Sequence, residues 1–344
     1  MPYSVRFEAP RTVSVVEEGE PPLRPGEVRL HTLYSGISAG TELTAYRGSN
    51  PYLNKEWDER LRLFRPGGSA VTFPVDGWGY EEVGTVVEVG PAVTGVRPGQ
   101  LVWGTWGHRG SVVQTEEHAA ARVLPAHAEP VLGIFSHIGA IALNVVLDAD
   151  IHVGETVAVF GLGVPGQIVA QLARLNGAEV IAVDVIPDRL AKAAELGAAH
   201  TVDAGDGEVA ERIRELTGGR GADVSLEVSG SYRALHEAIR ATAYGARVVA
   251  GGFFQHEGAG LALGEEFHHN RIQLVCSQIS GVAPAVGNRW TKYRLQHTAI
   301  ELAVAGRLRL QPLVTHVLPV EEAAAAFELL DQTPERALQV VLKF

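Results

Sequence analysis

The first part of the chain, from Tyr3 to about Pro130, consists of short apolar stretches broken by Gly and Pro. Examples are VRFEAPRTVSVVEE, GEVRLHTLYSGIS and EEVGTVVEVGPAV. This spacing is typical of many short antiparallel strands joined by turns. We therefore predict a strand-rich lobe of the barrel or sandwich type.

Between about Gly139 and Ile279 the pattern changes to apolar strands that alternate with longer helical segments. TVAVFGLG is followed by QIVAQLARLNG, and VIAVDV by DRLAKAAELG. Such alternation predicts a doubly wound parallel sheet with helices on both faces. The last part has two helical patterns and ends in the strand ALQVVLKF, which indicates a return to the first lobe. The predicted class is α/β, with domains at 1–137 plus 280–344 and at 138–279.

Composition narrows the kind of partner. The chain has 344 residues and a formal charge of -11, which gives no basic field for nucleic acid or an anionic membrane. No stretch reaches the roughly 18 uninterrupted apolar residues of a membrane span, and the N-terminus lacks the features of a signal peptide. We expect a cytoplasmic protein with a small-molecule substrate. Because Cys276 is the single cysteine, disulfides within the chain and multi-cysteine zinc sites are excluded.

A glycine-rich motif carries the clearest chemistry. It directly follows the apolar strand 156–160 and precedes a helix over 167–175. In this context the first glycine permits a tight turn, the second lets the backbone approach a pyrophosphate, and the third allows close packing of helix on strand. An ordinary turn of an α/β protein has the same pattern when nothing else supports it. The motif consists of Gly161, Leu162, Gly163, Val164, Pro165 and Gly166.

Asp184 supports a dinucleotide site, because it ends the next predicted strand, over 180–183. A carboxylate there accepts hydrogen bonds from the adenosine ribose and repels the extra phosphate of NADP. The following residue, Val185, is apolar. We therefore predict NAD as the cofactor. Arg189 is a candidate to lie over the adenine, with an ordinary surface position as the alternative.

Over nearly its whole length the chain resembles the medium-chain dehydrogenase/reductase superfamily, the zinc-type alcohol dehydrogenases. The resemblance rests on GISAGTELTAYRG, GYEEVGTVVEVG, GLGVPG and LVTHVLPVEEAAAAFELL. It implies a GroES-like catalytic domain, a Rossmann domain, a substrate cleft between them, and a homodimer or homotetramer. It also places Ala140, Ser229 and Gly251 at the cofactor.

The departures from this family concern zinc. Zinc-using members have a Cys, a His and a Cys, Asp or Glu where this chain has Ser38-Ala39, Tyr80 and Ser136-His137. A catalytic zinc needs three good protein ligands and an open position. We therefore predict no metal, with a rearranged site of Glu81, His108 and His137 as the alternative. The chain is similar in these segments to bacteriochlorophyllide dehydrogenases and to sugar or cyclitol dehydrogenases.

Without zinc, another group must take the hydroxyl proton in alcohol oxidation. The resemblance places several candidates at the cleft, and His137 is our first choice of base. Tyr80 would keep a hydroxyl near the reacting carbon, with filling of space as the alternative. Thr41 matches a relay position, unless it only forms a turn. The histidines have structural loop roles as alternatives. The candidates are His137, Tyr80, His108, Thr41 and Glu81.

These observations predict an NAD-dependent oxidoreductase that moves a hydride between a secondary alcohol and the nicotinamide without catalytic zinc. A sugar, a cyclitol or another polar alcohol is the expected substrate class. A quinone or enoyl reductase of the same superfamily is one alternative, although such relatives commonly use NADPH. A protein that binds NAD(H) without catalysis is the other.

Overall fold

The structure is a computed structural model that describes residues 2–68, 71–255 and 257–344. The chain divides into two compact units, Met1–His137 with Gln311–Phe344 (unit 1) and Ile138–Leu310 (unit 2). The first boundary coincides with the predicted one, but the second lies at 310 instead of 279. Residues 280–310 belong with unit 2, where Ala299 of α8 (Lys292–Val304) packs against Gly139 too closely to leave room for a side chain there.

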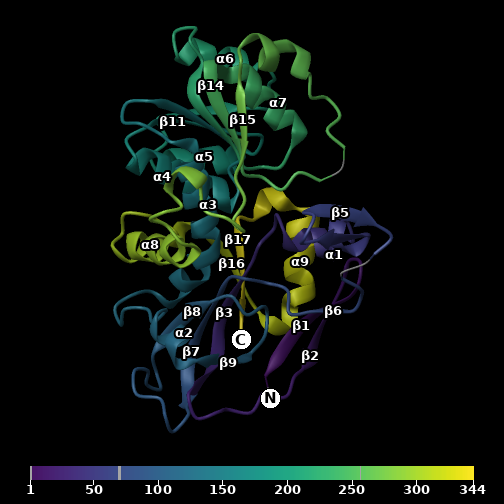
Figure 1. The fold of residues 1–344 in the computed structure, drawn as a ribbon, viewed down its shortest axis with the longest axis vertical. Helices are drawn as coiled ribbons and strands as arrows, with labels where there is room; N and C mark the ends of the chain where they lie inside the picture. Colours follow the sequence, from purple (N-terminus) through teal and green to yellow (C-terminus); the bar gives the residue numbers. More distant parts are fainter. Residues whose placement is uncertain (1, 69–70, 256) are drawn as a thin grey trace. The chain divides into compact units, whose positions relative to one another are not determined.

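Unit 1 is rich in short strands, as the sequence predicts. The larger sheet has the order β16-β17-β3-β7-β8, with β9 also paired to β3, and a smaller sheet has the order β2-β1-β6 (Figure 1). A separate hairpin joins β4 to β5. The strands are β1 (Tyr3–Ala9), β2 (Thr12–Glu17), β3 (Glu27–Ile37), β4 (Lys55–Asp58), β5 (Leu63–Pro66), β6 (Val75–Asp76), β7 (Glu82–Val89), β8 (Leu101–Gly104), β9 (Ser111–Thr115), β16 (Val314–Pro319) and β17 (Gln339–Lys343).

The last strand returns to this unit, which confirms the prediction from the closing apolar segment. β17 pairs antiparallel with β3, with Val340 opposite Ile37, and parallel with β16. The helices of the unit are α1 (Glu42–Tyr46), α2 (Glu116–Ala120) and α9 (Ala323–Gln332). Short 3-10 turns lie at Pro51–Leu53, Pro130–Phe135, Gln311–Leu313, Val320–Glu322 and Pro334–Arg336.

An aromatic core fixes α1 and α9 against the smaller sheet. The Phe327 ring lies 5.0 Å from Phe7 and 5.6 Å from Tyr46, measured between ring centroids. All three side chains are buried. Burial of rings this large holds α1 in place although it has only 5 residues. This matters for the site, because α1 begins with Glu42.

Unit 2 contains the predicted parallel sheet. Its strand order is β12-β11-β10-β13-β14-β15, and every neighbouring pair is parallel. The strands are β10 (Thr156–Phe160), β11 (Glu179–Asp184), β12 (His200–Asp203), β13 (Ala222–Glu227), β14 (Thr242–Ala250) and β15 (Gln273–Cys276). The other elements are α3 (Ser136–Ala149), α4 (Val164–Leu175), α5 (Pro187–Glu195), α6 (Val209–Leu216), α7 (Tyr232–Ala241), a π-helical turn (Leu263–Phe267) and a 3-10 turn (Pro284–Val286).

The order of the strands reverses at β10, which pairs with both β11 and β13. Because crossover connections between parallel strands are right-handed, winding in opposite directions from this point puts helices on both faces of the sheet. α4 contacts α5, and α6 contacts α7, in agreement with this arrangement. In such sheets ligands bind beyond the carboxyl ends of the strands at the reversal. The fold class is therefore confirmed.

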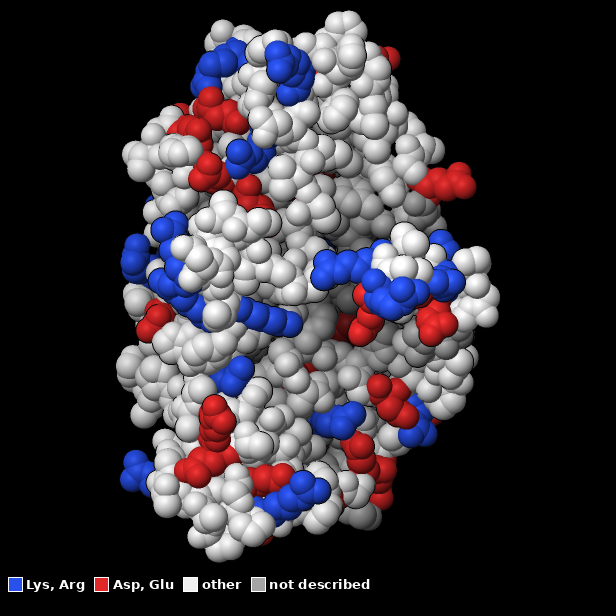
Figure 2. Space-filling model, viewed as in Figure 1, with Lys and Arg blue, Asp and Glu red and all other residues white. Residues whose placement is uncertain are grey.

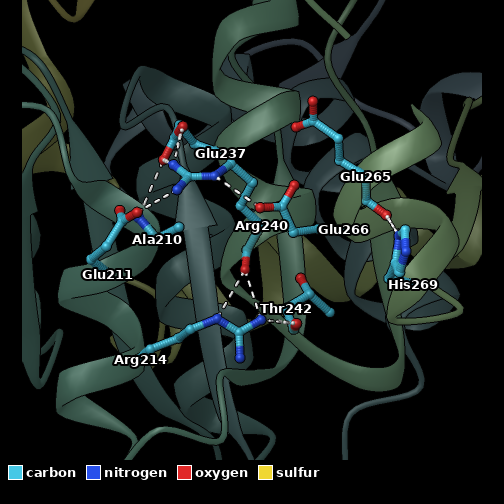
Figure 3. Close-up of polar contacts among 9 residues, drawn as sticks. All are labelled: Ala210, Glu211, Arg214, Glu237, Arg240, Thr242, Glu265, Glu266 and His269. Atoms are coloured by element: carbon cyan, nitrogen blue, oxygen red, sulfur yellow. Dashed lines mark hydrogen bonds and ion pairs between the residues drawn. The ribbon is translucent and has the colours of Figure 1, made fainter. Parts of the chain in front are cut away.

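Arginine side chains join the elements on one side of this sheet (Figure 3). The Arg240 guanidinium of α7 pairs with Glu211 of α6, with Glu237 one turn away and with Glu266 of the π-helical turn. Arg214 donates to the backbone carbonyl of Arg240 at 2.8 Å. We interpret this network as structural, because Arg240 pairs with three carboxylates and Arg214 donates to backbone carbonyls.

One segment, Pro130–Ala149, is long and apolar enough to cross a membrane by length and composition. It comprises a 3-10 turn and α3, and 78% of its apolar stretch is buried within the structure. A core helix of a folded protein has the same properties. On the face drawn in Figure 2, basic and acidic side chains are interspersed.

Candidate active site

The glycine-rich turn after β10 requires glycine at Gly161 and at Gly166. Gly161 has φ +88°, which favours glycine, and Gly163 is the N-cap of α4. A Cβ added to Gly166 would lie 1.8 Å from the carbonyl oxygen of Gly161. α4 begins at Val164, earlier than predicted, because Pro165 is tolerated in the first turn of a helix. Its free N–H groups are suited to a pyrophosphate.

Asp184 ends β11 and links this strand to the glycine turn. Its Oδ2 accepts the Leu162 N–H at 2.5 Å, and its Oδ1 accepts those of Val185 and Ile186 at 2.8 and 2.9 Å. A carboxylate has about four acceptor positions, so capacity remains for a ribose hydroxyl. Arg189 is half-buried in α5, and its carbonyl accepts from Gln167 at 2.8 Å.

The turn after β13 lies against the glycine turn. A Cβ on Gly161 would approach the Cβ of Ser229 to 2.5 Å, so these two predicted residues are neighbours. The buried Glu227 carboxylate accepts the N–H groups of Ser229 at 2.8 Å and Gly230 at 3.1 Å. Its backbone carbonyl accepts the N–H of Gly251 at 2.8 Å. The predicted Ser229 and Gly251 are thereby fixed at adjacent strand ends.

Glu227 itself was not predicted as part of this site. Burial raises its pKa to about 7, although hydrogen bonds from Ser229 and Gly230 oppose the rise. The available signal is a glutamate at the end of the apolar strand ADVSLEVSG. Ala140 has no exposed surface within α3, and we do not carry it into the cofactor site. The remaining residues fit a dinucleotide, with the phosphates at Gly161–Gly166 and the ribose at Asp184.

In unit 1 the structure brings together part of the predicted catalytic set. The Ser38 hydroxyl forms a short hydrogen bond with the Tyr80 hydroxyl, on which Thr41 also acts as a hydrogen-bond partner. The His137 ring lies 4.7 Å from the Tyr80 ring between centroids, at an interplanar angle of 62°. Three hydroxyls and an imidazole thus lie together in unit 1.

The Tyr80 hydroxyl stays protonated near neutral pH. Burial raises its pKa, the negative charge of Glu81 adds to the rise, and hydrogen bonds from Ser38 and Thr41 oppose it. Tyr80 is therefore a hydrogen-bond donor and not a base. Ser38 was not among the predicted candidates. Its signal is its place in GISAGTEL, at the position of a family ligand.

His108 and Glu81 do not lie with this group as catalysts. The His108 side chain is 1% exposed, with Nε2 2.5 Å from Glu42 Oε2 and Nδ1 2.6 Å from Ser35 Oγ. Both ring nitrogens are therefore occupied inside the protein, so we withdraw His108 as a general base. Glu81 is 1% exposed as well, and its Oε2 has no hydrogen-bond partner among the residues that the structure describes. Burial raises the pKa of Glu81 well above its usual range, and the charges of Glu42 and Glu82 add to the rise.

Glu82 completes this buried layer. Its Oε1 accepts from the Ser35 hydroxyl at 3.1 Å, and its Oε2 accepts the Trp106 N–H at 2.7 Å. Burial raises its pKa to about 7, although the positive charge of His108 lowers it. These buried side chains are connected to the hydroxyls of Ser38 and Tyr80, because Glu42 Oε1 accepts the backbone N–H of Ser38 at 2.9 Å.

The residues present do not fit the zinc ion that the family implies. The Ser38 and Tyr80 hydroxyls replace thiolate and imidazole, and they bond to each other. Within residues 2–68, 71–255 and 257–344, no group of three or more His, Cys, Asp or Glu side chains is arranged to hold a metal. The alternative site of Glu81, His108 and His137 is not assembled, since His108 is held by Glu42 and Ser35.

Comparison with known proteins defines the class. The model of the family described as "Zinc-binding dehydrogenase" matches residues 163–292, which lie inside unit 2 and include none of Ser38, Tyr80 and His137. D-guloside 3-dehydrogenase from Escherichia coli is 29% identical over 344 residues, 98% of each chain. Residues 163–292 match this family, and over its full length the chain is similar to alcohol and polyol dehydrogenases of the medium-chain type.

Two further relatives agree. (R,R)-butanediol dehydrogenase from Bacillus subtilis is 27% identical over 306 residues, covering 81% of this chain and 83% of its own. Its crystal structure has a TM-score of 0.78 at 23% identity and covers 100% of both chains. A dehydrogenase from Sinorhizobium meliloti 1021, solved bound to NADP, has a TM-score of 0.80 at 23% identity, covering 100% of this chain and 99% of its own. These structures share the fold.

Proposed function

We propose that the protein oxidises a secondary alcohol of a polyol, sugar or cyclitol with NAD and without catalytic zinc. The observation that carries this proposal is the hydroxyl pair of Ser38 and Tyr80 beside His137, at the positions of the family's metal ligands. Hydroxyls hold an alcohol oxygen by hydrogen bonds, and an imidazole takes a proton near neutral pH. Relatives named for butanediol and D-guloside support this substrate class.

The reaction transfers a hydride and a proton from the alcohol to two different acceptors. The alcohol loses a hydride from carbon and a proton from oxygen, giving a ketone, NADH and one proton. The bound nicotinamide supplies the hydride acceptor. In unit 1, Tyr80 and Ser38 orient the substrate oxygen, and Thr41 supports the Tyr80 hydroxyl. His137 accepts the proton, and in the reverse direction it returns the proton while Tyr80 donates a hydrogen bond to the carbonyl.

The preference for NAD rests on Asp184. Its carboxylate is held against the glycine turn by the Leu162 N–H at 2.5 Å, with its charge at the position of the ribose. A phosphate on that ribose would meet this charge. We keep the small-molecule substrate, the homodimer or homotetramer and the cytoplasmic location as predictions from composition and family resemblance.

The test uses purified protein, dialysed against a chelator and assayed for metal by mass spectrometry. NAD reduction is followed with sorbitol, (R,R)-2,3-butanediol and a methyl D-guloside. Turnover that survives chelation, with NAD preferred over NADP, supports the proposal. Stoichiometric zinc with chelator-sensitive turnover would overturn its metal-free part. Reduction of a quinone or enone alone would indicate the reductase alternative, and NADH binding without turnover would indicate a nucleotide-binding protein.

A further inference from the structure

Three ionisable side chains of unit 1 are sealed from water and arranged in a row. Glu42 and Glu82 are 0% exposed and His108 is 1% exposed. The two ring nitrogens of His108 lie 2.5 Å from Glu42 Oε2 and 2.6 Å from Ser35 Oγ. The Ser35 hydroxyl in turn donates a hydrogen bond to Glu82 Oε1 at 3.1 Å. Charged groups this deeply buried destabilise a fold unless each has a partner. Nothing in the proposed reaction uses them directly.

The protein holds the His108 ring in a single orientation. The backbone of His108 donates its N–H to Trp78 and accepts the N–H of Val5, both at 2.9 Å. The edge of the ring faces Phe327 at 5.9 Å between centroids. Gly79 lies so close that an added Cβ would come within 3.1 Å of ring atoms. The imidazole therefore has no room to turn away from Glu42.

The other oxygen of Glu42 points to the hydroxyl pair. Glu42 Oε1 accepts the backbone N–H of Ser38 at 2.9 Å, and the Ser38 hydroxyl bonds to Tyr80. We propose that the buried Glu42–His108 ion pair positions Ser38, and through it Tyr80, for binding the substrate oxygen. His108 is thus a positioning residue that acts through Glu42. This inference rests on the proposed function, because it assigns a role within the same site.

The surroundings of His108 support its positive charge. It faces Glu42 from α1 and Glu82 from β7, whereas Ser35 on β3 and Phe327 on α9 are uncharged. Burial by itself lowers the pKa of His108, but the charges of Glu42 and Glu82 outweigh burial and raise it. An imidazolium donates from both nitrogens, which satisfies the Glu42 carboxylate and the Ser35 oxygen together.

Two substitutions separate the contacts of the ring. In His108→Gln the longer amide reaches the position of Nε2 and keeps a donor for Glu42. In His108→Asn the shorter amide reaches only the position of Nδ1 and keeps the contact with Ser35. Hydrogen exchange at the Ser38 N–H, followed by NMR, reports the positioning without any substrate. We expect exchange to quicken about tenfold or more in His108→Asn and much less in His108→Gln.

Amide protons of β10 serve as an internal control. Because β10 lies in unit 2, outside the network around His108, their exchange is expected to be the same in wild type and in both variants. Equal Ser38 exchange in wild type and His108→Asn would overturn the positioning role. Should His108→Asn fail to fold, Glu42→Gln gives a second readout. The ring nitrogens of His108, labelled with 15N, are expected to show an imidazolium at pH 7 in wild type and a neutral ring in Glu42→Gln. A neutral ring in both proteins would overturn the ion pair.

Activity then tests the link to the proposed function. With (R,R)-2,3-butanediol as the probe, kcat is expected to fall at least about tenfold more in His108→Asn than in His108→Gln, with NADH affinity unchanged. Equal losses in both variants would contradict positioning through Glu42. A wild-type protein that oxidises none of the alcohols would refute the proposed function, while the exchange and NMR measurements would still decide the Glu42–His108 pair.

Discussion

Unit 2 presents its candidate cofactor site mainly through backbone, whereas unit 1 presents its candidate proton-handling site through side chains. In unit 2 the phosphates would meet N–H groups between Gly161 and Gly166, which are neighbours in sequence. In unit 1 the site joins Ser38, Tyr80 and His137, which lie far apart along the chain. A site made of contiguous backbone leaves a motif in the sequence, and a site assembled from distant side chains does not.

The largest expected effect tests the side-chain site. Tyr80→Phe and His137→Asn are each expected to lower kcat by about 10² to 10⁴-fold, because each removes a group that binds the alcohol oxygen or takes its proton. NADH affinity, measured by fluorescence titration, should remain within about twofold of wild type, because both residues belong to unit 1. A loss of NADH affinity that matches the loss of kcat would contradict this division of labour.

The second effect tests the backbone site. In Gly166→Ala the new methyl group would lie 1.8 Å from the Gly161 carbonyl oxygen, so the turn must shift. We expect NADH affinity to fall about 100-fold, since overpacking costs about 1–3 kcal/mol and also displaces the phosphate-binding N–H groups. Gly264→Ala, also in unit 2, is the matched control, because nothing lies within 4 Å of its added Cβ. Equal affinities in the two variants would remove the steric argument.

The fold and the glycine turn could both be predicted from the sequence, because both depend on residues that are close together along the chain. Strand and helix periodicity is local, and it predicts β10, α4, β11 and the return of β17 to unit 1. The boundary at 279 failed because α8 has the pattern of an ordinary helix. Its membership in unit 2 follows from packing of Ala299 on Gly139, which no local pattern encodes.

The catalytic candidates show where local reasoning stops. In the sequence His108 and His137 are both candidate bases, and His137 is only the first choice between them. Only three-dimensional contacts separate them, because His108 is enclosed by Glu42 and Ser35 while His137 lies beside Tyr80. Family resemblance identified Tyr80 through its alignment with a metal ligand. It did not identify the buried carboxylate layer, since the ionisation of Glu82 depends on burial and on the neighbouring His108.

A smaller effect concerns the choice between NAD and NADP. Asp184→Asn removes the negative charge. Its single amide oxygen can still accept the Leu162 N–H, but the N–H groups of Val185 and Ile186 then lose their acceptor. Hydrogen bonds to a charged group contribute about 1.5–3 kcal/mol, so NADH affinity should fall about tenfold. NADPH affinity should rise or stay level, because repulsion of the ribose phosphate is relieved. Parallel titrations with both nucleotides measure this, and an unchanged ratio of affinities would refute the role of Asp184 in selectivity.

The smallest expected effect is on the pH dependence of stability, and it concerns a kind of residue that occurs in both units. Glu227 in unit 2 and Glu82 in unit 1 are buried glutamates with pKa values of about 7. Between the unfolded value near 4.5 and 7, the folded state binds more protons than the unfolded state. Stability is therefore lost as pH rises through this window, by up to about 3 kcal/mol per group.

Glu227→Gln isolates this contribution in unit 2. Its amide oxygen can still accept the Ser229 N–H, the Gly230 N–H loses its acceptor at Oε2, and the side chain no longer titrates. We expect the free energy of unfolding, measured with urea from pH 5 to 8, to fall less steeply with pH in the variant, by about 1–3 kcal/mol across the window. The charge of His108 also acts on Glu82, so Glu82→Gln is expected to change the pH dependence of stability less than Glu227→Gln does. The same pH slope in wild type and Glu227→Gln would mean that the carboxylate holding the Ser229 turn is already ionised, and that hydrogen bonds rather than burial set its charge.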